Sequence, residues 1–230
     1  MPDKMTANNR GKTGRGRGQA MVDDVELNTK TEPSQDRAKN TFEAILSITG
    51  DLLVEVGFER LSTNLICKRA GITPPALYRY FPNKYAILKE LGDRLMKVQD
   101  DVVIKWVDSG GLDTGSLEEE IASNRRMMAG VLDVTKDFPG GAWVLRVMRV
   151  IPLLREVQME SRILVADKLY EGMRAKYPNV SDERLQTATL LTTDAGSSAI
   201  ELAIEEPDRA EAVLDETSVM VATYYHSFLK

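Results

Sequence analysis

The chain has 230 residues, of which 43% are hydrophobic and 28% charged, and its formal net charge is −5. This length and composition exclude a disordered or fibrous protein and allow one large or two small domains. One cysteine excludes a disulfide framework, and with one histidine the chain predicts neither a metal site nor a cofactor. Since no eighteen-residue apolar run and no secretory signal is present, we expect a cytoplasmic protein without a membrane partner.

The charge is distributed unevenly along the chain. Residues 1–20 carry +4 and residues 108–230 carry −8, while residues 36–107 are close to neutral at +2. Residues 1–35 lack aromatic side chains and include a Gly-Arg repeat, which predicts a flexible basic arm. Such an arm is either a plain tail or a segment that reaches DNA phosphates.

The remainder of the chain predicts helices almost throughout. Apolar residues recur at helical spacing, and Gly, Pro and capping residues separate the segments. No alternating pattern of useful length indicates a strand, so the predicted fold class is all-α. The expected helices end at Gly57, span about 62–71, 73–81 and 84–107, and continue at about 116–136, 141–151, 153–176, 181–205 and 208–229.

Two short helices joined by a turn at Gly71 form a candidate helix-turn-helix. In such a unit the first helix orients the second, whose N-terminal end enters the major groove of DNA. Ile72, Leu77 and Phe81 are expected to face the core. The second helix then presents these residues outward: Thr73, Pro74, Pro75, Ala76, Tyr78 and Arg79.

This stretch resembles the signature of the TetR (tetracycline-repressor) family of bacterial transcription regulators. The resemblance covers about residues 38–98 and is carried by Gly57-Phe58, Ser62-Thr63, Ile66 and the run from Ala70 to Lys84. It implies a small N-terminal helix-turn-helix domain and a larger C-terminal domain that binds a ligand and dimerises. The expected division is an arm at 1–35, a DNA-binding domain at 36–83, a connecting helix at 84–108 and a second domain at 109–230.

The resemblance also implies roles for single residues. Thr63 and Tyr78 would contact phosphates, and Lys84 would pair with a phosphate at a helix N-terminus. Arg79 stands where it can bind guanine through two hydrogen bonds, and Tyr80 is either phosphate-facing or structural. The full candidate set for DNA binding is Thr63, Asn64, Thr73, Pro74, Pro75, Ala76, Tyr78, Arg79, Tyr80 and Lys84.

Cys67 stands where the family usually has alanine, and we interpret it as a small buried hydrophobe rather than a redox sensor. In the second domain, small residues at helical spacing along 181–205 favour close packing against the last helix. The resemblance implies that these last two helices form the interface of a homodimer. The alternative is that their faces belong to the core of one subunit.

Methionines and both tryptophans gather in residues 103–173. Methionine adapts to irregular ligands, but it also fills gaps in an ordinary core, and the sequence leaves both readings open. The candidate ligand-binding residues are Trp106, Met127, Met128, Trp143, Met148 and Met159.

We therefore expect a homodimeric, ligand-responsive transcriptional regulator, most simply a repressor. Its expected partners are palindromic double-stranded operator DNA, a second copy of the chain, and a small apolar or amphipathic effector. The alternative is an architectural or division-linked DNA-binding protein of the same fold without an inducer. No catalytic set is visible in the sequence, so we expect no enzyme.

Overall fold

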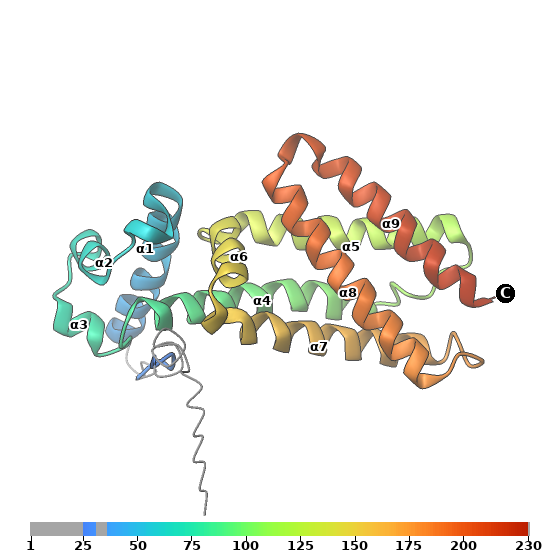
Figure 1. The fold of residues 1–230 in the computed structure, drawn as a ribbon, viewed down its shortest axis with the longest axis horizontal. Coiled ribbons are helices and arrows are strands. Elements are labelled where there is room, and N and C mark those ends of the chain that lie inside the picture. Colours follow the sequence, from blue (N-terminus) through green and yellow to red (C-terminus); the bar gives the residue numbers. More distant parts are fainter. Residues whose placement is uncertain (1–24, 31–35, 230) are drawn as a thin grey trace, which may run out of the picture.

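The computed structural model describes residues 25–30 and 36–229, and within them it contains helices and no strand. The all-α prediction is thus confirmed, with the arrangement drawn in Figure 1. Most of the predicted arm lies outside the described residues. The α-helices are α1 (Asp36–Arg60), α2 (Thr63–Ala70), α3 (Pro74–Tyr78), α4 (Lys84–Asp108), α5 (Leu117–Asp137), α6 (Gly141–Val150), α7 (Arg155–Arg174), α8 (Asp182–Glu205) and α9 (Ala210–His226), and short 3-10 turns precede α7 and flank α9.

Local signals in the sequence set the ends of the first helices. Gly57 adopts a left-handed φ of 72°, so the regular part of α1 ends there as predicted. The Ser62 hydroxyl accepts a hydrogen bond from the Leu65 amide and caps α2, and Gly71 ends that helix with a φ of 63°. The Asn83 side chain caps α4 in the same way. These signals produce the tight α2–turn–α3 unit.

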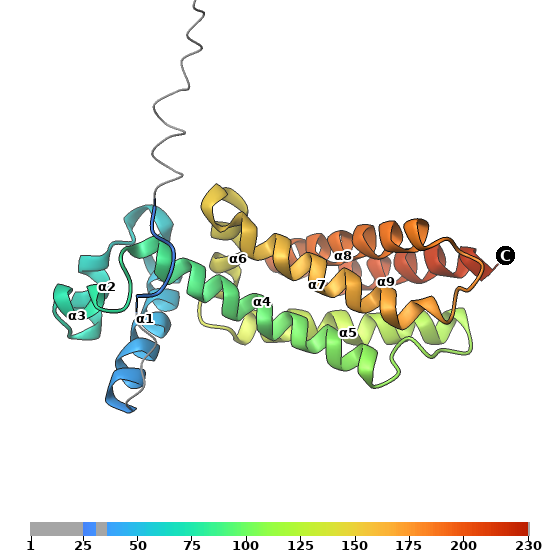
Figure 2. The same cartoon turned by 90° about the horizontal axis from the view of Figure 1, so that it is seen from below.

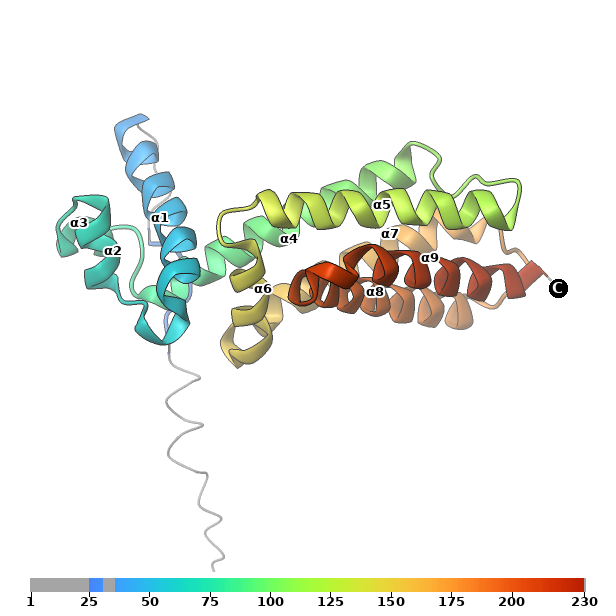
Figure 3. The same ribbon diagram turned by 90° about the horizontal axis from the view of Figure 1, so that it is seen from above.

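The larger part of the molecule is an elongated bundle of α4, α5, α7, α8 and α9. The helix α4 leaves the small N-terminal helices and runs along the bundle (Figure 2). The helices α8 and α9 pack side by side, opposite α4 (Figure 3). No helix in the described part of the chain is long and apolar enough to cross a membrane.

The hydrophobic core is divided between two clusters, but the division does not follow the predicted domain boundary. One cluster joins α1, α2, α3 and the first half of α4 with Val144, Val147 and Met148 of α6. The second cluster fills the bundle. It contains Val103 of α4, Leu132 of α5 and other residues of α5, α7, α8 and α9. The helix α6 therefore shares its core with the helix-turn-helix.

Glycines permit the close approach of α1 and α4 to the segment around α6. A Cβ added at Gly50 in α1 would lie 2.5 Å from the carbonyl oxygen of Pro139, just before α6. A Cβ at Gly92 in α4 would lie 2.7 Å from the sulfur of Met148. Such distances are below any normal contact, so larger residues require the helices to move apart.

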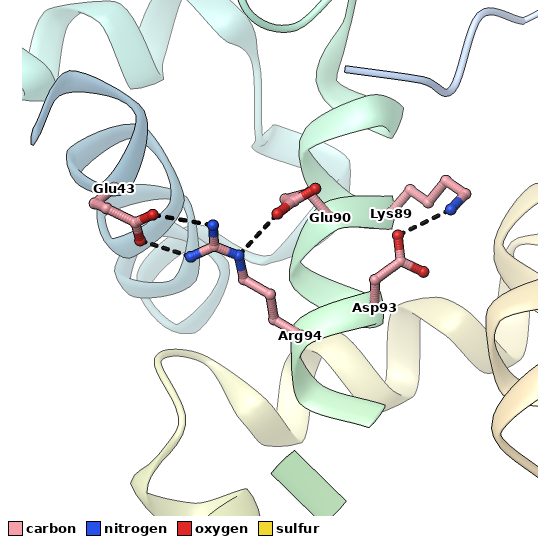
Figure 4. A network of polar contacts seen from close by, with 5 residues as sticks. All are labelled: Glu43, Lys89, Glu90, Asp93 and Arg94. Atoms are coloured by element: carbon pink, nitrogen blue, oxygen red, sulfur yellow. Dashed lines mark hydrogen bonds and ion pairs between the residues drawn. The ribbon is translucent and has the colours of Figure 1, made fainter. Parts of the chain in front are cut away.

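An ion-pair network also connects α1 with α4 (Figure 4). The Arg94 guanidinium of α4 donates to both oxygens of Glu43 in α1, at 2.6 and 3.0 Å, and to Glu90 one turn earlier at 2.8 Å. Lys89 and Asp93 form a second pair on α4 at 2.8 Å. The two-point bond to Glu43 fixes the direction in which α4 leaves α1.

Candidate nucleic-acid interface and cavity

The α2–α3 unit brings two of the predicted phosphate contacts together. Thr63 lies at the first position of α2 and Tyr78 at the last position of α3, and their hydroxyl oxygens share a hydrogen bond of 3.0 Å. Tyr78 is 41% exposed although it is a large aromatic residue. A rigid, exposed hydroxyl pair at the junction of two helices is suited to donate to a phosphate oxygen.

The start of α3 leaves side chains free for contact with a ligand. Thr73 occupies the N-cap position, but its hydroxyl makes no capping hydrogen bond. The reason is that Pro74 and Pro75 have no N–H group, and the amide of Ala76 donates to the backbone oxygen of Thr73 at 2.9 Å. The hydroxyl of Thr73 therefore stays available at the exposed end of the helix.

Most of the predicted base-reading residues share this exposed surface. Asn64, Pro74, Pro75 and Arg79 are exposed and Ala76 is partly buried. The Arg79 guanidinium carbon lies 5.8 Å from the centre of the Tyr80 ring, and Arg79 forms no ion pair among the described residues. These residues form one continuous candidate DNA-reading surface.

Two of the predicted DNA contacts point into the protein. The Lys84 ammonium donates to the backbone oxygens of Phe58 and Leu61 at 3.4 and 3.2 Å and lies 4.1 Å from the centre of the Phe58 ring. Burial lowers the pKa of Lys84. The Tyr80 ring is 5% exposed and packs edge-on against Phe42. These placements indicate structural roles, because Lys84 supplies a donor to two backbone oxygens and the Tyr80 ring fills part of the small domain's core.

Residues 25–30 lie against the turn between α3 and α4. The amide of Lys30 donates to the backbone oxygen of Tyr80 at 2.8 Å, and the Asn83 side-chain nitrogen donates to the backbone oxygen of Glu26 at 2.7 Å. The chain that precedes the small domain is thus attached beside the recognition unit.

A cavity of about 350 Å³ lies in the bundle, partly open to the surface and lined by residues of α4, α5, α6, α7, α8 and α9. This volume is in the range of sites that hold small organic molecules. Four of the six predicted ligand-binding residues line it, namely Trp106, Met127, Met128 and Met159.

Trp143 and Met148 do not line this cavity. Trp143 lies beside Gly57 of α1, where an added Cβ would be 3.6 Å from its ring, and the Arg146 guanidinium lies 4.9 Å from its ring centre. Met148 is 1% exposed in the core shared with the helix-turn-helix. The sequence correctly predicts that both side chains are at least partly buried, but α6 directs them toward α1 and α4 rather than into the cavity.

Asp100 is the cavity residue that the sequence reasoning missed. It lies on α4, is 7% exposed, and accepts a hydrogen bond of 2.6 Å from the Ser161 hydroxyl of α7. Burial raises the pKa of Asp100 to about 6. A signal was present, since Asp100 is in helical phase with Met96 and Val103, which are both buried.

Four other charged groups of the cavity wall form two ion pairs, while Arg155 forms none among the described residues. Arg162 donates to both oxygens of Asp194 at 3.1 and 3.0 Å, and Arg149 donates to Glu201 at 2.9 Å. The cavity wall thus combines methionine and aromatic side chains with a few fixed polar groups. This composition is typical of sites for amphipathic small molecules.

The helices α8 and α9 pack through small and polar residues on one side and present apolar residues on the other. Ala188, Ala199 and Ala203 are buried, and the Thr192 hydroxyl bonds the Tyr225 hydroxyl at 2.7 Å. The exposed apolar side chains of this pair of helices include Leu190, Leu191, Leu202, Val219, Met220 and Tyr224.

The α2–turn–α3 unit, with its exposed surface, has the geometry of a helix-turn-helix. The family model described as bacterial regulatory proteins, tetR family, matches residues 45–91, from the middle of α1 into α4. The match thus covers α2, α3 and parts of α1 and α4.

Individual relatives agree with this match. The tetracycline repressor protein class C of Escherichia coli is 38% identical over 56 residues, which are 24% of this chain and 26% of the repressor. The nucleoid occlusion factor SlmA of Haemophilus ducreyi is 22% identical over 150 residues, 65% of this chain and 67% of that protein. The chain spans about half the length of further curated relatives that it matches.

Solved structures share the fold at low sequence identity. A tetR-family transcriptional regulator from Streptomyces coelicolor has a TM-score of 0.59 and 16% identity, over 83% of this chain and 80% of that chain. The likeness therefore extends beyond the matched domain to the helical bundle that contains the cavity.

Proposed function

We propose that this protein is a homodimeric transcriptional repressor that binds a palindromic operator and leaves it when a small effector enters the bundle cavity. The observation that carries the proposal is the exposed α2–α3 surface on a domain whose core includes α6. The helix α6 also contributes Leu145 and Arg149 to the cavity wall. One ten-residue helix thus packs against α1 and α4 in the core of the small domain and also lines the cavity.

The exposed faces of α8 and α9 support a homodimer. Leu191 and Met220 are 58% and 54% exposed, and an uncovered apolar surface of this kind is typical of a protein–protein interface. A two-fold dimer also satisfies the geometry of DNA, because two recognition helices must be about 34 Å apart, or a multiple of it, to read successive major grooves.

The mechanism we propose is a shift in population. An effector that binds more tightly to a conformation with wrongly spaced recognition helices lowers operator affinity by its difference in affinity for the two conformations. The helices α4 and α6 are the elements whose position both ligands affect, since each contacts the helix-turn-helix and the cavity.

Operator binding is tested by electrophoretic mobility shift with DNA from upstream of the protein's own gene at physiological salt. We expect Arg79→Ala to cost about 1–3 kcal/mol at one base pair per half-site and to relax the preference there. Lys68→Ala is the control, because Lys68 is an exposed cation at the other end of α2. Binding no tighter than to random DNA contradicts the proposal, and an equal loss on every sequence removes the role of Arg79.

A second candidate function has support from two relatives, the SlmA proteins of Haemophilus ducreyi and Actinobacillus pleuropneumoniae. The match to SlmA favours a division-linked DNA-binding protein, which needs no effector. The cavity of about 350 Å³ favours the ligand-responsive repressor instead. Mapping of genomic binding sites separates the two functions. Many dispersed sites fit a division-linked protein, and one or a few operators fit a ligand-responsive repressor.

A further inference from the structure

The carboxyl group of Asp100 is an unusual feature of the cavity. It is 7% exposed, and the Ser161 hydroxyl is its hydrogen-bond donor, bound to one of its two oxygens at 2.6 Å. No other donor to Asp100 occurs among the described residues. A buried carboxylate is normally paired with a cation or receives several hydrogen bonds, because its charge is otherwise poorly solvated.

The cations of the same cavity do not supply this partner. Arg162 is paired with Asp194 and Arg149 with Glu201. Burial is the largest influence on the pKa of Asp100, and the neighbouring charge that affects it is the carboxylate of Asp101, which raises it further. The cavity therefore contains a carboxylate whose positive partner is missing from the described chain.

We propose that the effector is an organic cation, such as an amine, whose charged nitrogen binds Asp100 and whose apolar body fills the cavity. This inference rests on the proposed function, in which the cavity is the effector site. A primary or secondary ammonium group donates to the second oxygen of Asp100, and this oxygen has no donor from the protein. The hydrogen bond is charge-assisted and is made to a carboxyl that is 7% exposed, where it is stronger than on a surface.

The rest of the wall suits the apolar body of such a molecule. Met96 and Val103 flank Asp100 on α4, while Trp106 and Tyr225 add aromatic surface to the same cavity. Aromatic faces attract cations as well as apolar groups. The methionines adapt their side chains to ligands of different outline.

An anionic effector fits this wall less well. It would meet the carboxylate of Asp100, and two of the three cavity arginines are already paired, Arg149 with Glu201 and Arg162 with Asp194. The Arg162 Nε is buried without a hydrogen-bond partner among the described residues and is the donor that such an effector would have to reach. Arg155 is the one cavity-lining cation that forms no ion pair among the described residues, and it is exposed at the start of α7. A preference for an anion is therefore the outcome that would assign the recognition to Arg155 or Arg162 instead.

The test uses three probes with one apolar body and different head groups: 4-phenylbutylamine, 4-phenylbutan-1-ol and 4-phenylbutanoate. Their dissociation constants are measured by isothermal titration calorimetry on the full chain at pH 7.5. We expect the amine to bind at least about tenfold more tightly than the alcohol or the acid. Asp100→Asn should abolish this preference, because the amide keeps the shape but not the charge.

Asp101→Asn is the matched control. Asp101 is the next residue of α4 and does not line the cavity, so this variant should keep the preference for the amine. Three results overturn the inference: an amine affinity unchanged in Asp100→Asn, tighter binding of the acid, or no binding of the amine up to about 10 mM.

The pH dependence gives a second readout. The other titratable groups facing the cavity are Arg149 of α6, Arg155 and Arg162 of α7, Asp194 and Glu201 of α8, and Tyr225 of α9, while α5 contributes none. Amine binding should weaken as the pH falls through about 6, since Asp100 is then protonated. Asp100→Asn should remove this dependence, and its persistence in that variant would overturn the assignment of the charged nitrogen to Asp100.

The two proposals fail separately. Amine binding is measured without DNA, so a protein that binds its operator but no amine contradicts only the inference about Asp100. A protein that binds the amine but no operator contradicts the proposed function. If both bind, the amine should also lower the affinity for operator in the mobility-shift assay.

Discussion

Replacing Asp100 by asparagine should make the empty protein more stable. The carboxyl has a pKa of about 6 in the folded chain and 3.8 as its ordinary value, so the folded protein holds a proton that the unfolded chain releases between these pH values. The contribution of this carboxyl to stability is therefore most favourable below about pH 4, falls between pH 4 and 6, and is constant above that range. The gap of about 2 pH units corresponds to about 3 kcal/mol of lost stability at pH 7.5.

Asparagine does not ionise and still offers an oxygen to the Ser161 hydroxyl. We therefore expect Asp100→Asn to gain up to about 3 kcal/mol at pH 7.5, a rise in Tm of about 6–12 °C for a chain of this size. Urea unfolding at pH 4.5, 6 and 7.5, at one fixed protein concentration, measures the gain. Asp101→Asn is the control and should show a much smaller change. A variant no more stable than the wild type at pH 7.5, or a gain that persists undiminished at pH 4.5, refutes the reasoning.

Two further predictions concern the small domain and its junction with the bundle. Lys84→Met should lower stability by about 1–2 kcal/mol, because the Leu61 backbone oxygen loses the Lys84 donor and the Phe58 oxygen keeps only the Leu61 amide. It should change the salt dependence of DNA binding by much less than the loss of one phosphate contact would. Gly50→Ala should lower stability by about 1–3 kcal/mol, because the added methyl overlaps the carbonyl of Pro139. Thermal unfolding measures both losses.

Each of these variants has a control on its own helix. Lys97→Met removes an exposed cation of α4, and Ser47→Ala changes an exposed residue of α1, so neither should lower Tm. If Lys84→Met reduces the slope of log affinity against log salt concentration by about one, Lys84 contacts a phosphate. An unchanged Tm for Gly50→Ala would show that α1 and the segment before α6 separate without cost.

The order of the helices and most of their ends were predictable because local signals decide them. Gly57, Ser62, Gly71 and Asn83 act on their own turns through backbone conformation or capping, and no distant residue is needed to interpret them. The exposure of Tyr78 followed from the same local reasoning, since Leu77 and the residues in phase with it fill the core.

The remaining features depend on contacts between distant segments. Lys84 binds backbone oxygens 26 and 23 residues earlier, and helical periodicity carries no information about such partners. The direction of the Trp143 and Met148 side chains depends on the orientation of α6. The close approaches at Gly50 and Gly92 restrict that orientation. Asp100 is in helical phase with buried residues of its own helix, but its hydrogen-bond donor Ser161 lies 61 residues away on α7, and no local pattern indicates that contact.

The shared core of α6 and the helix-turn-helix has a consequence for chimeric regulators. The unit that packs with the DNA-reading helices is discontinuous in sequence, since it includes residues of 36–98 and also of 138–157. A graft that exchanges the first hundred residues for those of a relative leaves α6 behind, facing a foreign surface. A graft that also carries residues 138–157 preserves that interface, so its folding and its response to ligand are expected to survive the exchange.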